Sequence, residues 1–431
     1  MNKQILRLAI PNIISNLSVP LLGAVDTAIL GHLEKTYFLG ALAIGGVIFN
    51  FIYWGFGFLR MGTTGITAQA YGQKNQTELF LILVRTLGMA LAGGCILILF
   101  QTIIAKISFG LIQATPDVEQ YAREYFYIRI YAAPATLALY AIHGWFLGMQ
   151  NVKYPLVLTL LVNALNLALN FIFVFGLGMK SDGVALGTVL AQYSGLFVAV
   201  ALFLKTYRSH IVKIDRAELL EKIAIKKIFS VNIDIFIRTL ALIFTFSYFT
   251  AKSAEGGDSM LAVNTILLQL INILAYGVDG FAFAAESLAG KYVGAKDERN
   301  LRRTIRISFA WAMGLGLIIA SAFWGFEESI LQLFTNKSEL VKLAMGYMPW
   351  VIVAPFVNIF CFIWDGVFIG ATATPPMRNS MLLSAFGIFL PAYLLLRDPL
   401  GNHSLWLALT LFMVMRGVTL TLYAKKHIYR L

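Results

Sequence analysis

Polar side chains inside long apolar stretches are the residues of this sequence that could do chemistry. Asn163, Asn166 and Asn170 follow one another at intervals of three and four residues in LVNALNLALNFIFVFG, so a helix presents them on one face. Asp26 lies in the equally apolar LSVPLLGAVDTAILGHL. Amide and carboxylate oxygens are ligands for hard cations, and a buried carboxyl group can also take up a proton. The pattern predicts cation ligands or, for the asparagines, hydrogen bonds between helices.

Four further acids stand in apolar runs, namely Asp234, Asp279, Glu286 and Asp365. An ionisable group at the centre of a membrane span costs roughly 2.5–3.5 kcal/mol on insertion scales, so each is a candidate functional group. Asp234 has Arg238 one helical turn later, and this spacing favours a structural ion pair on one helix face.

The remaining acids are candidates for lining a substrate cavity. Aromatic rings beside them could contact a flat cation by stacking and cation–π attraction, although ordinary helix packing explains any single ring equally well. The residues predicted for this cavity are Asp279, Glu286, Asp365, Tyr53 and Tyr248.

The segments that carry these residues read as membrane spans. Of 431 residues, 59% are apolar and 13% are charged, whereas soluble domains carry about 25% charged residues. Runs of the required length of roughly 20 apolar residues occur about twelve times. The runs are continuous rather than alternating, so we expect helices and exclude a β-barrel. The sequence predicts an all-α membrane protein.

Charge placement predicts how the spans are oriented. The net charge of +12 is the excess of 34 lysines and arginines over 22 aspartates and glutamates, and the basic residues concentrate in alternate loops and at the ends of the chain. Cytoplasmic loops collect such residues, so we expect both termini in the cytoplasm and the protein in the inner membrane. The same bias explains the positive charge without nucleic acid, which we exclude as a partner.

Two motifs recur 222 positions apart and divide the chain into halves. GQKNQTEL at Gly72–Leu79 returns as GAKDERNL at Gly294–Leu301, and GWFLG at Gly144 returns as GVFIG at Gly366. An offset of six spans preserves helix direction, so the halves are parallel repeats, as in many transporters. We predict an N-lobe at 1–207, a cytoplasmic linker at 208–226 and a C-lobe at 227–431.

The sequence resembles the MATE family of multidrug exporters, in particular its DinF branch, within the MOP flippase superfamily. The resemblance covers both halves and nearly the whole chain. It rests on VDTAILGHL, GITAQAYGQ, NALNLALN, GVALGT, NIDIFIRTLAL, AVNTILLQL, AYGVDGFAFAAESLAG, DGVFIGAT and MRNSM.

This resemblance implies two six-helix lobes in a V, exporting organic cations against a proton or sodium gradient. The family's coupling site in the N-lobe is similar to Asp26, Asn166, Asn170 and Thr188 here, with a backbone carbonyl near Val184. These residues would hold Na⁺ if sodium is the coupling ion. In one departure, DinF-like sequences usually carry a second aspartate where this chain has Asn170. The resemblance also implies helix bending at Pro11, and Pro20 is a second proline in the first span.

The expected mechanism is antiport by alternating access in a monomer, without a cofactor, for a small cationic or amphiphilic substrate. The alternative is export of a lipid-linked or other amphiphilic metabolite. An enzyme is not expected, because no HExxH, GxSxG or paired His/Asp constellation occurs in the sequence.

Overall fold

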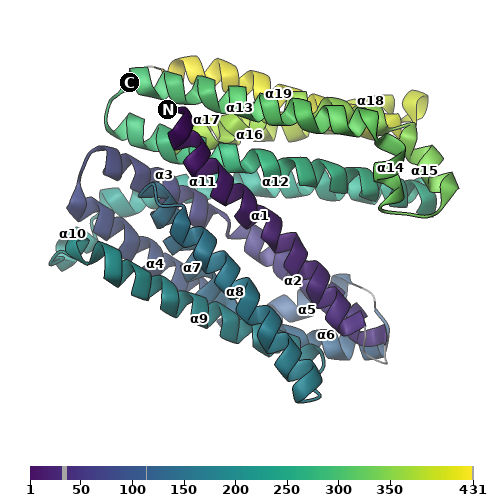
Figure 1. Cartoon of the computed structure of the whole chain (residues 1–431), viewed down its shortest axis with the longest axis horizontal. Helices are drawn as coiled ribbons and strands as arrows, with labels where there is room; N and C mark the ends of the chain where they lie inside the picture. Colours follow the sequence, from purple (N-terminus) through teal and green to yellow (C-terminus); the bar gives the residue numbers. More distant parts are fainter. Residues whose placement is uncertain (32–35, 113, 430–431) are drawn as a thin grey trace. The chain divides into compact units, whose positions relative to one another are not determined.

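The computed structural model describes the backbone of residues 1–31, 36–112 and 114–429, and all regular secondary structure in these residues is helical; side chains at 19 and 21–36 fall outside this description. Figure 1 shows the helices in chain order. They are α1 (Asn2–Gly31), α2 (Thr36–Gly55), α3 (Phe58–Gly72), α4 (Gln76–Leu99), α5 (Gln101–Leu111), α6 (Pro116–Arg129), η1 (Ile130–Ala132), α7 (Ala133–Gly148), α8 (Lys153–Phe171), η2 (Ile172–Gly176), α9 (Ser181–Tyr207), η3 (Arg208–His210), α10 (Arg216–Leu219), α11 (Lys222–Glu255), α12 (Asp258–Gly294), α13 (Glu298–Gly325), α14 (Glu327–Gln332), α15 (Ser338–Met345), α16 (Met348–Gly370), α17 (Thr374–Leu382), η4 (Leu383–Phe389), α18 (Leu390–Leu400) and α19 (His403–His427).

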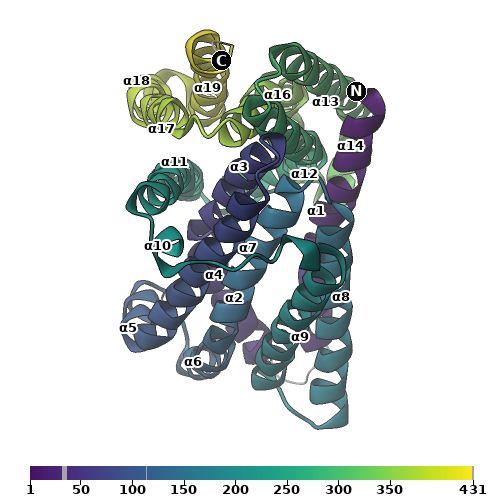
Figure 2. The same ribbon diagram turned by 90° about the vertical axis from the view of Figure 1, so that its left-hand side faces the viewer.

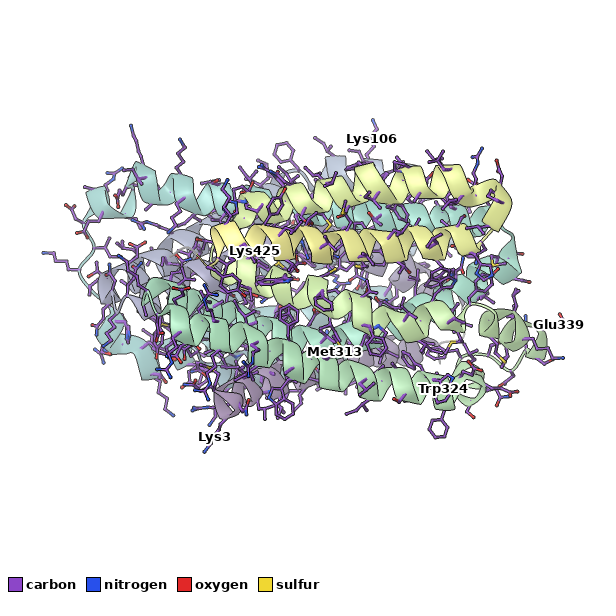
Figure 3. All side chains as sticks on the ribbon, turned by 90° about the horizontal axis from the view of Figure 1, so that it is seen from above. Lys3, Lys106, Met313, Trp324, Glu339 and Lys425 are labelled. Atoms are coloured by element: carbon purple, nitrogen blue, oxygen red, sulfur yellow. The ribbon has the colours of Figure 1, made fainter. Side chains whose placement is uncertain are left out.

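Most of these helices are built to face lipid. Within the described residues, 11 helical segments are long and apolar enough to cross a membrane. Large apolar side chains are exposed along them, including Leu99, Phe197 and Ile318. Trp324 points away from the end of α13 (Figure 3), and its exposed ring suits the boundary between lipid and water. A chain with this surface is stable only in a membrane.

The chain forms two compact units. The N-terminal unit contains residues 14–228, and the C-terminal unit contains residues 229–431 together with residues 1–13. Each has its own apolar core. The first core is built around Phe49, Phe126 and Leu137, and the second around Phe249 and Trp406. In the N-terminal unit α8 and α9 lie side by side (Figure 1), and in the C-terminal unit α12 packs on both α13 and α16 (Figure 2).

The first 13 residues of α1 pack on the C-terminal unit. A Cβ atom added to Gly280 would lie 2.3 Å from Ile13 Cγ1 and 2.8 Å from the Ala9 carbonyl oxygen, so α1 passes directly over α12 there. Gln4 Oε1 accepts a hydrogen bond of 3.5 Å from the Tyr292 hydroxyl. Glycine at position 280 is therefore required for this close approach, because any side chain would push the two helices apart.

The internal repeat is confirmed by the backbone. The left-handed conformation at Lys74, with φ of 56°, recurs at Lys296, with φ of 54°. Helix contacts repeat as well. A Cβ atom on Gly144 would lie 2.4 Å from the carbonyl oxygen of Arg60, and one on Gly366 would lie 2.3 Å from that of Ala282. All of these pairs are 222 positions apart, so the two units share one helical framework.

The segment after α9 is held to the N-terminal unit by a buried arginine. Arg85 on α4 donates hydrogen bonds to the carbonyl oxygens of Glu218, at 2.6 Å, and Leu219, at 3.2 Å. These carbonyls end the short helix α10; the Glu218 carbonyl oxygen also accepts a hydrogen bond of 3.3 Å from the Glu221 backbone N–H, and the guanidinium group adds a partner for both carbonyls. The predicted linker is thus attached to α4 at this point.

Candidate functional site

A chain of hydrogen bonds joins α8 to α9 inside the N-terminal unit. Asn170 Nδ2 donates to Asn166 Oδ1 at 3.2 Å, and Asn166 Nδ2 donates to Thr188 Oγ1 at 3.0 Å. Thr188 Oγ1 in turn donates to the Val184 carbonyl oxygen at 2.9 Å. The structure therefore brings together four residues predicted for ion coupling. We call Asn166, Asn170, Thr188 and Val184 the amide chain.

Two local features place the amide chain in the interior. Asn166 and Asn170 are 3% and 0% exposed, so their side chains are buried between helices. Gly187 lets α9 approach, because a Cβ atom there would lie 2.3 Å from Asn170 Oδ1. The segment η2, a single π-helical stretch, begins two residues after Asn170, and such stretches are frequent at functional sites.

The third asparagine of the predicted face contacts another helix. Asn163 Nδ2 donates to Ser18 Oγ at 3.2 Å, which connects α8 to α1. Asp26, the predicted carboxylate, is on α1 as well, but its side chain lies outside the described residues. Pro11 and Pro20 both fall within the continuous helix α1, and bending there stays a prediction.

Ser18 and Gly187 are site residues that the sequence reasoning missed. Ser18 is one small hydroxyl residue among apolar ones, and Gly187 was visible only as part of the GVALGT motif. Their importance depends on the approach of α1 and α9 to α8, which no spacing within a single segment reveals.

The C-terminal unit contains a different kind of polar interior. Asp365 Oδ2 accepts hydrogen bonds from Arg416 Nη2, at 2.6 Å, and from Arg238 Nη2. Asp234 binds Arg378 Nη1 at 2.6 Å and the Thr374 hydroxyl at 2.8 Å. We call the five charged residues of these pairs the charge cluster; it joins α11, α16, α17 and α19.

The predicted ion pair between Asp234 and Arg238 is wrong. The two residues share a helix face, but each finds its partner on another helix. Arg238 is 8% exposed and its long side chain reaches Asp365 on α16, while Arg378 and Thr374 at the start of α17 occupy the Asp234 carboxylate. Helical spacing brings two side chains near each other, but it does not exclude a better-placed partner from another helix.

The other residues predicted for the substrate cavity lie in both units. Tyr53 is in the N-terminal unit, where its ring stacks on Phe49 with centroids 5.6 Å apart. In the C-terminal unit, Glu286 is 1% exposed on α12, and Asp279 is half-buried two turns earlier. Tyr248 packs edge-on against Phe389. The shared cavity stays a prediction.

The amide chain offers neutral oxygen atoms rather than a metal-binding cluster. Among the side chains that the structure describes, no three His, Cys, Asp or Glu residues come together. Amide, hydroxyl and carbonyl oxygens suit a hard cation such as Na⁺, and the same groups can exchange hydrogen bonds with a nearby acid. The geometry is therefore compatible with either coupling ion.

Comparison with known proteins identifies the family. The family model MatE matches residues 11–172 and 235–394, which together are most of the chain and fall in both repeats. The chain belongs to the MATE family. It is therefore a multi-pass membrane protein and a secondary transporter of the multidrug and cation antiporter type, rather than an enzyme.

Relatives of this MATE protein match it over nearly its full length. DNA damage-inducible protein F of Escherichia coli K12 is 37% identical over 99% of this chain and 92% of its own length. The chloroplastic protein DETOXIFICATION 44 of Arabidopsis thaliana is 26% identical over 96% of this chain and 80% of its own. A MOP superfamily transporter from Pyrococcus furiosus has a similar fold, with a TM-score of 0.88, 18% identity and coverage of 99% of this chain and 96% of its own. The predicted family and the predicted all-α membrane fold are confirmed.

Proposed function

We propose that this MATE transporter exports organic cations or amphiphilic metabolites by antiport, and that the coupling ion binds in the N-terminal unit. The observation that carries the proposal is the amide chain. Buried polar groups in a membrane interior are expensive, and they mark ion pathways when they face one another inside a bundle. Four such groups from two helices converge here, beside a third helix that carries Asp26.

The ion would be held by the predicted ligands together. Asp26 supplies the negative charge, and Asn166, Asn170, Thr188 and the Val184 carbonyl supply neutral oxygens. With sodium as the coupling ion, these oxygens replace its hydration shell. With a proton, Asp26 takes it up and the amides adjust their hydrogen bonds to a neutral acid.

Antiport then requires that ion and cargo favour different states of the transporter. A bound ion neutralises Asp26 and weakens its attraction for a cationic cargo, which favours release to the outside. Loss of the ion to the cytoplasm restores the charge for the next cargo. Only a difference in affinity between the two states can drive this cycle, since equal binding to both shifts no population.

We place both termini on the cytoplasmic side of the inner membrane. In the C-terminal unit, Lys3 and Lys425 lie toward one end of the helices and Glu339 lies toward the other (Figure 3). Basic residues thus accompany both chain ends, in agreement with the tendency of lysine and arginine to stay in the cytoplasm.

The test is uptake of a fluorescent organic cation into proteoliposomes under separately imposed pH and sodium gradients. The variants are wild type and Asp26→Asn, with Asp117→Asn in an exposed position of α6 as the matched control. We expect one gradient to drive uptake in wild type and the control, and no gradient to drive it in Asp26→Asn. Full gradient-driven uptake by Asp26→Asn would refute the assignment of coupling to this residue. An absence of gradient-driven dye movement in wild type would favour a lipid-linked cargo instead.

A further inference from the structure

The start of α11 carries a basic face with an apolar side chain between its charges. Its four members are exposed, namely Lys222, Ile223, Lys226 and Lys227. At about 100° per residue they fall within an arc of about 140° on the helix, with Ile223 between Lys226 and Lys227. Ile223 is 78% exposed. We call these four residues the lysine face.

The lysine face ends a segment that is positively charged as a whole. From Lys205 to Lys227 the sequence has seven lysines and arginines but three acids. One of these acids, Glu221, is directed to another cation, because its Oε2 atom lies 3.9 Å from Nη2 of the buried Arg85. Glu78 on α4 lies within electrostatic range of Lys227. Among the described residues, however, no lysine of the face forms an ion pair, so the face keeps an excess of positive charge.

The course of α11 places the lysine face at a membrane surface. The helical segment Arg216–Glu255 is long and apolar enough to cross a membrane. Exposed apolar side chains follow the face directly, beginning with Phe229 and Ile233. At 1.5 Å per residue, the distance along the helix from Lys222 to Phe229 is about 10 Å. The headgroup region on each side of a bilayer is roughly 5–8 Å deep, so the face lies among the headgroups when Phe229 enters the hydrocarbon.

The linker holds the lysine face in place from both of its ends. Before the linker, the Tyr207 hydroxyl accepts a hydrogen bond of 3.0 Å from Asn151 Nδ2, and its ring packs edge-on against Trp145 with centroids 5.0 Å apart. The chain then runs without regular structure from η3 to α10 (Figure 2), where Arg85 binds the end of α10. Residues up to 228 belong to the N-terminal unit. The face is therefore part of a folded surface and not of a free tail.

An ordinary surface in water would not explain the mixture of residues. Ile223 and the nearby Leu220, which is 53% exposed, are large apolar side chains that would gain nothing from water. Among lipid headgroups the same mixture is favourable, because lysine stems cover apolar surface while their ammonium groups reach the phosphates. The exposed isoleucine and the lysines around it thus point to one environment.

We propose that the lysine face binds the headgroup of an anionic phospholipid. The three ammonium groups supply positive charge and hydrogen-bond donors for the phosphate, and Ile223 contacts the apolar part of the same lipid. Clusters of lysine and arginine directly beside a membrane span attract anionic lipids in this way. In the orientation proposed above, the lipid belongs to the cytoplasmic leaflet.

This inference goes beyond the proposed function, because it concerns a lipid and neither the coupling ion nor the cargo. It uses the proposed orientation only to name the leaflet. Since the linker joins α9 to α11, a lipid bound at the lysine face fixes the end of the linker at the membrane surface.

The test is native mass spectrometry of the full chain released from mixed micelles that contain phosphatidylglycerol and phosphatidylcholine with identical acyl chains. The two lipids differ only in the headgroup and its charge. The variants are Lys226→Gln and the triple variant Lys222→Gln/Lys226→Gln/Lys227→Gln. The control loses the same charge elsewhere, in Lys106→Gln/Lys337→Gln/Lys342→Gln, whose lysines are exposed on or beside α5 and α15.

We expect wild type to bind its first phosphatidylglycerol more tightly than phosphatidylcholine, and the difference to shrink at high salt. Lys226→Gln should weaken this first binding by about fivefold, the usual effect of one lysine at an anionic surface. The triple variant should weaken it by more than tenfold. The control variant should bind both lipids as wild type does. Unchanged binding of phosphatidylcholine in all variants shows that they are folded.

Three results would overturn the proposal. Wild-type affinity for phosphatidylglycerol in the triple variant would show that the lysine face binds no lipid headgroup. Equal loss of both lipids would show that the lysines support the fold and recognise no charge. Displacement of the first phosphatidylglycerol by millimolar inorganic phosphate would assign the face to a free anion. Failure of the proposed function has a separate readout, namely gradient-driven uptake in proteoliposomes.

Discussion

The two units share a helical framework but differ in the polar groups that they bury. In the N-terminal unit, neutral amides and a hydroxyl form the amide chain between α8 and α9. In the C-terminal unit, carboxylates and guanidinium groups form the charge cluster between α11, α16, α17 and α19. The same scaffold thus carries a chain of neutral polar groups between two helices of one copy and a cluster of paired charges between helices of the other.

One position shows the contrast within the repeat itself. His143 and Asp365 stand 222 positions apart, each directly before the glycine that touches the neighbouring helix. His143 lies beside Arg60, whereas Asp365 is bound by two arginines. A position fixed by helix packing has therefore acquired a basic side chain in one unit and an acidic one in the other.

This difference points to different tasks. The neutral oxygens of the amide chain keep the same charge whether or not an ion is bound, so only Asp26 of the proposed site changes its charge when the ion leaves. A buried ion pair cannot change so easily, because removing one partner leaves the other charge uncompensated, at a cost of about 3–5 kcal/mol. We infer that the N-terminal unit exchanges the ion while the C-terminal unit keeps its charges fixed.

The largest effect is expected from Asp365→Asn. This change leaves Arg238 and Arg416, which are 8% and 1% exposed, without their shared carboxylate. The free energy of unfolding should fall by about 3–5 kcal/mol, as for other broken buried pairs. Thermal unfolding in detergent measures it, with the exposed Asp398→Asn as the control. A variant that is as stable as wild type but uncoupled would reverse the roles assigned to the two units.

The next largest effect is expected from a change that separates α9 from α8 at the amide chain. Gly187→Ala places a methyl group 2.3 Å from Asn170 Oδ1, so α9 must move away from α8. We expect a loss of about 1–3 kcal/mol of stability, typical of overpacking, together with reduced gradient-driven transport. Gly314→Ala is the matched control in the C-terminal unit, because nothing lies within 4 Å of its added Cβ atom. Wild-type transport by Gly187→Ala would show that the amide chain tolerates displacement.

Asn166→Ala should separate coupling from stability. Hydrogen bonds between membrane helices contribute only about 0.6 kcal/mol on average, so the loss of stability should be small. Gradient-driven uptake should nevertheless fall by about tenfold, within the usual range for loss of coupling between two sites. Parallel unfolding and uptake assays decide the matter. A large destabilisation with coupling intact would make the amide chain a structural element like the charge cluster.

The smallest effect on the free energy of unfolding is expected from replacing the N-cap residues Asn75 and Asp297, which occupy equivalent positions in the two repeats. Each side chain accepts a hydrogen bond from a backbone N–H three residues later, at 3.0 Å, and replacement by alanine should cost about 1 kcal/mol in either unit. The hydrogen bonds from Asn300 lower the pKa of Asp297 below its ordinary value. Its contribution is therefore complete above the ordinary pKa and is lost as the pH falls through the lowered one. Asn75 does not titrate.

Unfolding of the two single variants as a function of pH tests this difference. Asp297→Asn should remove a small acid-dependent part of the stability, whereas Asn75→Ala should lower stability equally at every pH. An unchanged acid dependence in Asp297→Asn would assign that dependence to other carboxylates.

The sequence by itself determined the class of protein, the repeat and the composition of the candidate site. Long apolar runs specify membrane helices because a backbone in lipid must satisfy its own hydrogen bonds. The spacing of Asn166 and Asn170 put both on one face, and the family motif added Thr188 and Val184. The apolar runs and the residue spacing depend only on which residues follow one another along the chain, and the sequence gives this information completely.

Only the tertiary structure decided which groups meet. Asp234 and Arg238 share a helix face, yet Asp234 binds Arg378 and Arg238 binds Asp365. Likewise, Ser18 contacts Asn163 because α1 crosses α8, a contact that no local pattern encodes. Helical periodicity fixes the direction of a side chain, but its partner depends on which other helix packs there and on the length of both side chains.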